Sequence, residues 1–321
     1  MVIGYLLKRL GLAVLVLLIV MVLLVLLIQF IPGDPARTIL GNHATPELIA
    51  QVRHNLGLDQ SVAHQILRFL GDALHGDLGD DYITGQPVAG ELGPALANTA
   101  ILSVAGIGLA LLVGIPTGIL AAVRQGGIVD TLIRAASVLL LSMPSYVVAL
   151  LLLLWFAVDN HVLPALGAGH PSAPADYLAH LVLPAVSLSV FWWAYLARLV
   201  RGSMLEVLGQ PYVRTARAYG LTERTTLYRV ALKNALVPIT ALSGLLIGYV
   251  LTGTVYAEVI FNRPGIGSLA ISAVGNHDWP VVRAIVLIYA AAFILGSLLA
   301  DLLYQFVDPR MRLDGRASVF T

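Results

Sequence analysis

The first long uncharged run decides the fold: residues Leu10–Pro32 read LGLAVLVLLIVMVLLVLLIQFIP. A helix needs about 20 mostly apolar residues to cross the hydrocarbon core of a bilayer. This run is longer than the apolar part of a secretory signal, so we expect it to be retained as a span. Further runs of spanning length occur at Asn98–Val123, Ala135–Val158, Tyr177–Ala197, Ala235–Ala257 and Arg283–Val307. The sequence therefore predicts an all-α membrane protein with six transmembrane helices.

The composition points to lipid as the solvent of most of the chain. Of its 321 residues, 58% are hydrophobic and 12% are charged. Soluble domains usually carry about twice that charged fraction. The chain has no cysteine, which excludes disulfides, thiolate metal sites and cysteine nucleophiles.

Lysine and arginine indicate the orientation, because short cytoplasmic loops are enriched in both. With the N-terminus inside, the inner loops hold 14 of the 19 basic residues and the outer loops hold five. We therefore expect both termini to be cytoplasmic, in a multi-pass protein of the plasma (inner) membrane.

The predicted organisation has four parts. These are an N-terminal transmembrane helix at 1–32, an extracytoplasmic segment at 33–96, a transmembrane core at 97–312 with a cytoplasmic loop at 209–230, and a cytoplasmic tail at 313–321. In the outer segment we expect two short helices, Pro46–Asn55 capped by Thr45, and Gln60–Leu74. The outer loop around Asn160–Asp176 is rich in Pro, Gly and Ala, so it should be irregular.

The inner loop after the fourth span is the most informative segment. Residues 209–238 read GQPYVRTARAYGLTERTTLYRVALKNALVP. Pro211 suits the first turn of a helix, Gly220 suits a left-handed turn that ends it, and Thr222 can cap a second helix. Two interpretations fit the residues: a basic helix on the membrane surface, or a contact site for a soluble partner.

This loop resembles the EAA loop of ABC importer permeases, in the form YVRTARAxGL of the peptide and nickel branch. In that family the loop is the coupling helix, which sits in a groove of the ATP-binding subunit. The resemblance implies an ATPase-coupling role for Tyr212, Val213, Arg214, Thr215, Ala216, Arg217, Ala218, Gly220 and Leu221. Arg214 stands where the family has its leading Glu, so no ion-pair role of that acid carries over.

Further family motifs follow in order along nearly the whole chain. They include IPGDP at 31–35, LGLD at 56–59, LHGDLG at 74–79, EVIFNRPGIG at 258–267 and DWPVV at 278–282. The chain departs from the family at Asp80 and Asp81, where an aromatic residue and a serine are more usual. The resemblance implies the type I ABC importer permease fold.

The family implies a function in import. Dipeptides or short oligopeptides would arrive on an extracytoplasmic peptide-binding lipoprotein and cross between this chain and a homologous second permease subunit. Two ATP-binding subunits would hold ATP and Mg, with no cofactor or nucleic acid on this chain. The residues agree, because neither lysine, Lys8 or Lys233, lies in the Gly-Lys-Ser/Thr loop that cradles phosphates. We expect a non-catalytic permease subunit in contact with lipid.

Alternatives from other classes find less support. Nickel or another small solute of the same branch stays open as the substrate, but the eight histidines include no i, i+4 pair, so we predict no metal site. Intramembrane hydrolysis lacks the motifs HExxH and GxSxG. An ion-coupled secondary transporter would need ionisable groups near the midplane, and the candidates are Glu258 and Asp301.

Residues beyond the fifth span are candidates for the translocation path or outer gate: Glu258, Asn262, Arg263 and Asp278. Glu258 is either an interfacial charge or a gate-lining acid. Glycines should let spans two and five approach other helices closely, namely Gly106, Gly108, Gly114, Gly118, Gly244, Gly248 and Gly253. Prolines such as Pro144 should bend their spans.

Overall fold

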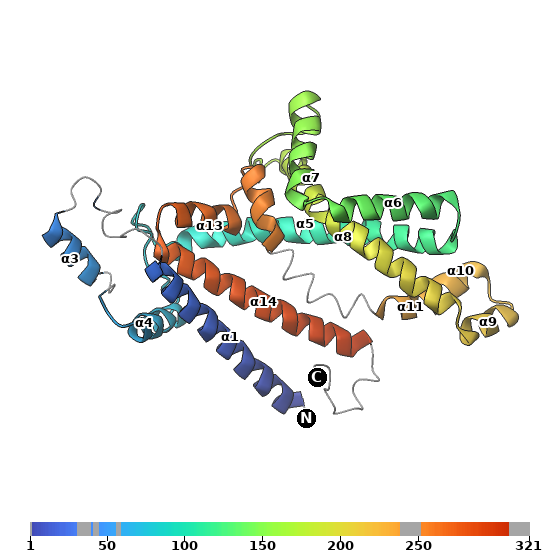
Figure 1. Cartoon of the computed structure of the whole chain (residues 1–321), viewed down its shortest axis with the longest axis horizontal. Coiled ribbons are helices and arrows are strands. Elements are labelled where there is room, and N and C mark those ends of the chain that lie inside the picture. Colours follow the sequence, from blue (N-terminus) through green and yellow to red (C-terminus); the bar gives the residue numbers. More distant parts are fainter. Residues whose placement is uncertain (1, 31–39, 41–44, 56–58, 238–251, 308–321) are drawn as a thin grey trace. The chain divides into compact units, whose positions relative to one another are not determined.

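The computed structural model describes residues 2–30, 40, 45–55, 59–237 and 252–307 (Figure 1). These residues form helices and connecting loops, and an isolated bridge between Asp80 and Pro87 is the one β-type pairing among them. The predicted all-α class is therefore confirmed for this part of the chain. The chain divides into two compact units, one from residues 1–99 and 264–294 and the other from residues 100–263 and 295–321.

The first unit joins the N-terminal region to part of the C-terminal region. It contains α1 (Val2–Phe30), α3 (Pro46–Asn55), α4 (Val62–Leu74), α13 (Ile266–Gly275), the start of α5 (Val88–Val123) and the first half of α14 (Trp279–Val307). The prediction for α3 is confirmed, and Thr45 Oγ1 accepts a hydrogen bond from the Leu48 N–H. The predicted second helix begins two residues later than expected, because Ser61 caps it by accepting the His64 N–H.

The outer segment shares a core with the first apolar helix. Ile66 and Phe69 of α4 lie against Met21 and Val25 of α1, and all four side chains are buried. A segment this short cannot bury enough apolar surface alone. Packing against α1 supplies the missing contacts.

The second unit is built around α5 and α8. It contains most of α5, then α6 (Ile128–Ser142), α7 (Ser145–Leu152), the π-helix η2 (Leu153–Asp159), α8 (Pro174–Leu208), α9 (Pro211–Ala218), α10 (Glu223–Thr225), the π-helix η3 (Thr226–Ala231), α11 (Leu232–Ala235) and a helix at 252–260. The loop between η2 and α8 is irregular, as predicted.

Within the described residues, three helices are long and apolar enough to cross a membrane: α5, α8 and the Trp279–Leu298 part of α14. They coincide with the predicted second, fourth and sixth spans. The predicted first span falls on α1, which is apolar over Gly11–Leu26. Most of the predicted fifth span and the side chain of Asp301 lie outside the described residues. The total of six spans therefore stays a prediction.

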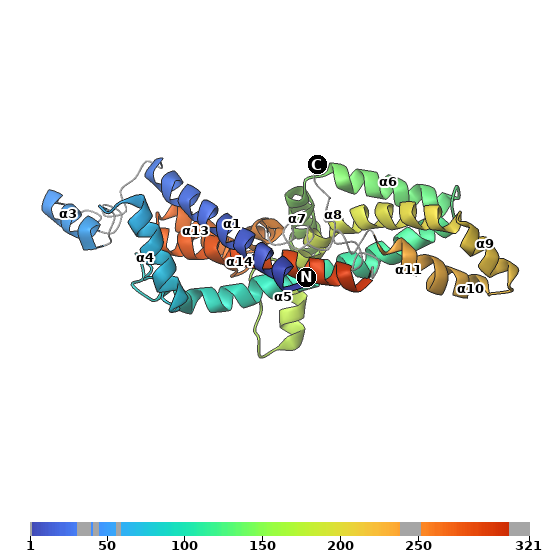
Figure 2. The ribbon, with the colours of Figure 1, turned by 90° about the horizontal axis from the view of Figure 1, so that it is seen from below.

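The predicted third span, Ala135–Val158, is broken and not one straight helix. The helices on either side of Met143–Pro144 meet at 103°. Proline lacks an N–H, and its ring disfavours helical geometry in the residue before it, so α6 has to end there. Met143 is accordingly extended, with φ −90° and ψ 130°. Figures 1 and 2 both show α7 leaving the line of α6.

Glycines bring α5 and α8 into close contact. An added Cβ would lie 2.7 Å from Leu188 at Gly106, 2.9 Å from Leu196 at Gly114 and 2.6 Å from Val200 at Gly118. Each partner lies 82 residues further along the chain, so the two helices run parallel. Small residues at four-residue spacing let helix backbones approach in this way.

The prediction of close helix packing has different outcomes at the other four glycines. Gly253 also approaches closely, since an added Cβ would lie 2.9 Å from Leu188, so close packing is confirmed there. The same prediction is wrong for Gly108 within the described part of the chain, where no heavy atom lies within 4 Å of an added Cβ. It lies two residues from Gly106 and so faces a different side of α5. Gly244 and Gly248 lie outside the described residues.

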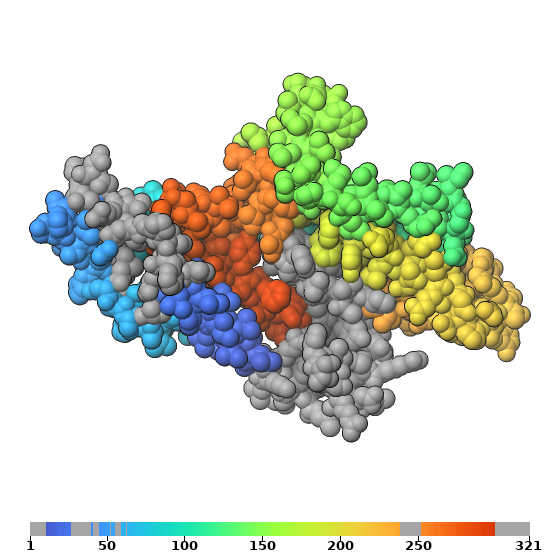
Figure 3. Space-filling view, in the orientation of Figure 1, coloured from blue at the N-terminus to red at the C-terminus, as the bar shows by residue number. Residues whose placement is uncertain are grey.

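Parallel packing of α5 and α8 constrains the chain between them. The segment that connects two parallel helices must return along their length. α6 makes the start of this return, because it packs along α8 (Figures 1–3). Taken together, α6 and α7–η2 are long and apolar enough to make one span, by length and composition.

We predict that Gly118→Ala destabilises the protein while Gly108→Ala does not. At Gly118 the new methyl group would meet Val200 Cβ at 2.6 Å and the Ala197 carbonyl oxygen at 2.8 Å. Overpacking of this kind costs about 1–3 kcal/mol, more than the gain in helix propensity of about 1 kcal/mol. Thermal unfolding in detergent measures the difference. Equal melting temperatures for the two variants would contradict the packing of α5 on α8.

Candidate functional site

The segment that follows α8 forms a small helical assembly at the end of that helix (Figures 1 and 3). α9 begins at Pro211, in the first turn, as predicted. Proline is tolerated there because the first N–H groups of a helix have no partner within it. Gln210 precedes it in an extended conformation, with φ −71° and ψ 147°, and sets the change of direction after α8.

A left-handed turn ends α9, as the sequence predicts. Gly220 has φ +79°, and its N–H donates to the Arg217 carbonyl oxygen at 2.9 Å. The next N–H, of Leu221, donates to the Ala216 carbonyl oxygen at 3.3 Å. No heavy atom of the described residues lies within 4 Å of a Cβ added at Gly220. The turn therefore requires glycine for its backbone angle and not for space.

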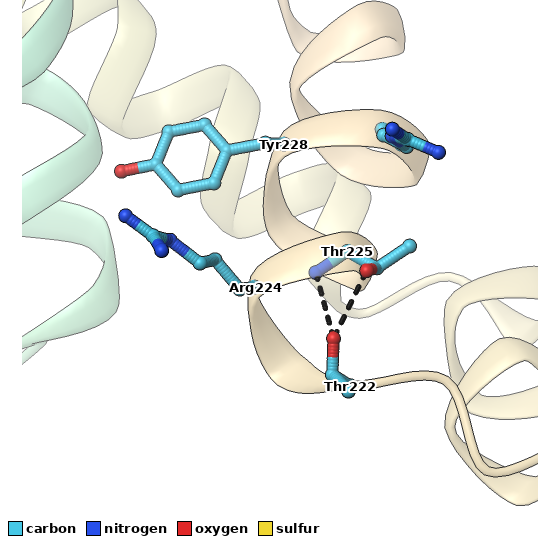
Figure 4. Close-up of a pocket in the computed structure, with 5 residues that line it drawn as sticks. Thr222, Arg224, Thr225 and Tyr228 are labelled. Carbon is cyan, nitrogen blue, oxygen red and sulfur yellow. Dashed lines mark hydrogen bonds between the residues drawn. The ribbon is translucent and has the colours of Figure 1, made fainter.

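Thr222 caps the next helix, again as predicted. Its Oγ1 accepts the Thr225 N–H at 3.3 Å and lies 2.9 Å from the Thr225 hydroxyl (Figure 4). The helix that follows is not regular, because α10 passes directly into the π-helix η3 before α11. Short π-helical turns are rare and are frequent at functional sites. The sequence carries no signal that predicts this turn.

Three contacts hold α9 against the rest of the assembly. Val213 is fully buried where α9 packs against η3 and the end of α8. The Tyr212 hydroxyl accepts a hydrogen bond from Asn234 Nδ2 at 3.0 Å. Arg217 forms a two-point ion pair with Glu223, at 2.7 Å and 3.1 Å, across the Gly220 turn. That pair is solvent-exposed, so it contributes at most about 1 kcal/mol.

Apart from Val213, the predicted coupling residues lie on the surface. Ala216 is half-buried, and the side chains of the others are exposed: Tyr212, Arg214, Thr215, Arg217, Ala218 and Leu221. Val213 is buried, so a partner protein cannot contact its side chain. Its role is to anchor α9. Tyr219, which the sequence analysis missed, is 85% exposed. An exposed aromatic residue beside basic ones is typical of a protein contact surface.

A basic pocket adjoins this surface. It has a volume of about 540 Å³ and is lined by Thr222, Arg224, Thr225, Tyr228 and Arg229. Figure 4 shows Arg224 and Tyr228 on the same side of the helix. Glu223 is engaged by Arg217, so the exposed charge of this region is positive. A partner surface here would need acidic or other hydrogen-bond-accepting groups.

A buried ion pair, which the sequence analysis did not single out, connects α6 to α8. Arg201 donates to the two carboxylate oxygens of Asp130 at 2.6 Å and 2.9 Å, and the Gly126 N–H donates to one of them at 3.0 Å. Asp130 is 1% exposed. Its partner lies 71 residues away, so no local pattern predicts the contact.

The predicted outer-gate residues belong to both units. Glu258 and Arg263 are buried and Asn262 is exposed, all in the second unit, whereas Asp278 is buried in the first. Asn262 has φ +46°, a conformation uncommon for residues other than glycine. It therefore forms a sharp turn after the helix at 252–260. Within the described residues, no group of three or more His, Asp or Glu could hold a metal ion.

Arg263 is the most unusual of these residues. Its Nη2 donates to the Tyr177 hydroxyl at 2.8 Å, and its guanidinium lies 5.0 Å from the centre of the Tyr177 ring. Nε and Nη1 are buried and have no hydrogen-bond partner among the described residues. A buried guanidinium is destabilised when its hydrogen bonds are incomplete.

Two family models match the chain. Residues 114–313 match the family described as "Binding-protein-dependent transport system inner membrane component". Residues 2–103 match the N-terminal region of the membrane components of the same transport systems. Together these matches cover nearly the whole chain, including α9 and the Gly220 turn.

Curated relatives and a solved structure agree with the family models. A probable peptide ABC transporter permease of Sinorhizobium fredii is 39% identical, over 96% of this chain and 99% of the relative. A dipeptide transport system permease of Alkalihalophilus pseudofirmus is 34% identical over 97% and 99%, and a glutathione transport system permease of Escherichia coli is 36% identical over 97% and 99%. A chain of the MetNI methionine ABC transporter has a similar fold, with a TM-score of 0.55 at 18% identity over 68% of this chain and 96% of that chain.

We predict that Gly220→Ala loosens the end of α9, whereas Gly202→Ala in α8 has no such effect. Both glycines have open space around an added Cβ, and of the two only Gly220 has a positive φ. Alanine in the left-handed region costs about 1–2 kcal/mol, while alanine within a helix is favourable. Hydrogen exchange of the Gly220 and Leu221 region should therefore accelerate about tenfold in Gly220→Ala. Unchanged exchange would mean that the turn does not depend on glycine.

Proposed function

Since the chain belongs to the family of binding-protein-dependent transport system inner membrane components, we propose that it is the permease subunit of an ATP-driven importer of dipeptides or short oligopeptides. The single observation that carries the coupling part of this proposal is the solvent-exposed helix α9, which buried Val213 anchors and the Gly220 turn ends. The peptide part is supported by relatives named as peptide, dipeptide and glutathione permeases.

The proposed topology has six crossings with both termini in the cytoplasm. The parallel packing of α5 and α8 supports an odd number of crossings between them, which the bent α6–α7 pair supplies. Both helices would then run from the outer face to the inner face. α9 follows the C-terminal end of α8, so this arrangement puts the basic coupling assembly in the cytoplasm, as the lysine and arginine distribution favours.

The proposed partners follow from the absence of a phosphate-binding loop in the sequence and from the exposed surface of α9. Two ATP-binding subunits would hold ATP and Mg, and this chain would carry no catalytic group. One of them would receive α9 and the exposed Tyr219 in a groove with acidic groups toward Arg214 and Arg224. A homologous second permease would complete the pathway, and an extracytoplasmic binding lipoprotein would deliver the peptide. Lipid surrounds the spans, and no nucleic acid takes part.

The contacts within the chain suggest how a displacement of α9 would be transmitted to the other helices. α9 packs against both η3 and the end of α8, so a displacement of α9 acts on both. The Arg201–Asp130 pair transmits motion of α8 to α6, and the glycine contacts transmit it to α5. The three helices would therefore turn together as one body when the ATP-binding subunits close.

At the outer side we propose that the turn from Glu258 to Arg263 belongs to the gate. The incompletely paired guanidinium of Arg263 and the positive φ of Asn262 support this, because strained and unpaired groups cluster where a protein changes conformation. Asp278 lies in the other unit, and its contacts favour a separate role, argued below.

The topology predicts which surface a reagent can reach. The chain has no cysteine, so a single introduced cysteine reports one position. In intact cells, a membrane-impermeant thiol reagent should label Ser172→Cys in the outer loop and should label Tyr219→Cys only after the membrane is opened. Both positions are exposed in the structure. Labelling of Tyr219→Cys in intact cells would overturn the proposed orientation.

The coupling proposal predicts that Ala216→Glu and Gly220→Val uncouple transport. A charge at half-buried Ala216 would be placed in an apolar contact at a cost of up to a few kcal/mol, and valine at Gly220 opposes the positive φ by about 1–3 kcal/mol. Labelled-peptide uptake should fall about tenfold or more in both, with less ATP-binding subunit copurified. Ala216→Ser keeps the small side chain and serves as the control.

The outcomes separate the two parts of the proposal. Normal uptake and copurification in both variants would mean that α9 is not the coupling element. Absence of peptide uptake by the unaltered transporter, with intact ATP-binding subunits present, would instead mean that the solute is not a peptide.

A further inference from the structure

Two buried carboxylic acids meet in the first unit, where the loop at 79–88 reaches the start of α14. Asp81 belongs to the loop and is 7% exposed, and Asp278 directly precedes α14 and is 1% exposed. Acidic side chains are almost never fully buried without a partner. Two such acids side by side need a physical explanation.

Backbone N–H groups hold each carboxyl group in place. Asp81 Oδ1 accepts from the N–H groups of Ile83 and Thr84, at 2.6 Å each, and so closes the tight part of the loop. Asp278 Oδ2 accepts from the Tyr82 N–H at 3.1 Å. Its other oxygen accepts from the Val281 N–H at 3.4 Å, in the first turn of α14. Asp278 therefore connects the loop to the helix.

The two carboxyl groups lie close together, because Asp278 Oδ2 accepts from the N–H of Tyr82, the residue that follows Asp81. Two adjacent carboxyl groups that are both buried repel one another when both are ionised, so a proton on one of them stabilises the pair. We propose that Asp81 and Asp278 form a proton-binding site that fastens the 79–88 loop to the start of α14 while the pair holds one proton.

The surroundings decide which acid carries the proton. Burial, followed by the negative charge of Asp81, raises the pKa of Asp278 to about 6. Burial alone would raise the pKa of Asp81 too, but the N–H groups of Thr84 and Ile83 outweigh it and hold that pKa below its usual value. The proton accordingly resides on Asp278, and Asp81 stays ionised.

A pocket gives solvent access to Asp81. It has a volume of about 370 Å³ and is lined by Asp81 and Tyr82 together with Pro280 and Arg283 of α14. Burial raises the pKa of the Tyr82 phenol, so it stays neutral over the range that matters here. The other charged or titratable groups around the pocket are Arg68 and Asp72 of α4, and Asp77, Asp80 and Arg283; His277 precedes Asp278 in the chain.

The sign of the pH effect follows from proton counts. Above about pH 5 an unfolded loop has both acids ionised, whereas the folded pair still holds one proton. The folded state binds more protons there, so its stability decreases as the pH rises through about 6. Above that pH, two adjacent buried carboxylates repel one another and the loop loosens from α14.

Hydrogen exchange of the purified full chain in detergent tests this inference. Corrected for intrinsic rates, protection of the amides at 82–84 should decrease about tenfold between pH 5 and pH 7.5. Asp278→Asn should abolish this dependence, because the asparagine amide donates to Asp81 without a proton. Asp81→Asn should do the same by donating to Asp278. Asp80→Asn, at the exposed neighbouring acid, should keep the full dependence.

Three results would overturn the inference. In the first, protection of the amides at 82–84 does not change with pH in the unaltered chain. In the second, both Asp278→Asn and Asp81→Asn keep the full pH dependence. In the third, Asp80→Asn removes it.

Adding Ca²⁺ or EDTA at pH 7.5 should have no effect on this protection. Restored protection with Ca²⁺ would mean that the pair binds a divalent cation instead of a proton. None of these readouts depends on the transported solute.

Discussion

The close contact of α5 with α8 is the constraint on which the second unit depends. Gly106, Gly114 and Gly118 let α5 approach within reach of side chains at the same spacing on α8, and a methyl group at Gly118 would already be too large. Lipid offers no hydrophobic drive for helices to associate, so this tight packing has to supply the attraction. Because the two helices are parallel, their packing also fixes the direction in which the segment between them must run. It likewise determines at which end of the second unit α9 follows α8.

Charged contacts add to this packed pair of helices. The two-point ion pair between Asp130 and Arg201 adds α6 to the same packed group of helices. The Arg217–Glu223 pair is exposed and weak, and it bridges the turn after α9. The two-point contact between Asp130 and Arg201 thus lies between α6 and α8, which should move together. The weak contact lies where a partner protein would remodel the surface.

Local rules made the coupling segment predictable. Pro211, Gly220 and Thr222 each act within four residues of themselves, and all three have the predicted role. Contacts distant in sequence were not predictable, such as Asp130 with Arg201 or Asp81 with Asp278. Pro144 predicted a bend but not its 103°, which depends on packing. The failure at Gly108 was avoidable, because a four-residue spacing selects Gly106, Gly114 and Gly118 and excludes it.

The central claim is that α9 and its turn contact an ATP-binding subunit. Thr215 is exposed on α9, and the chain contains no native cysteine, so Thr215→Cys places a unique thiol on that surface. The most direct measurement is thiol cross-linking of Thr215→Cys in membranes that contain the complete transporter. The account predicts a cross-link to the ATP-binding subunit whose yield changes with ATP. A cross-link to the binding lipoprotein, or none to the ATP-binding subunit from any exposed position of α9, would contradict it.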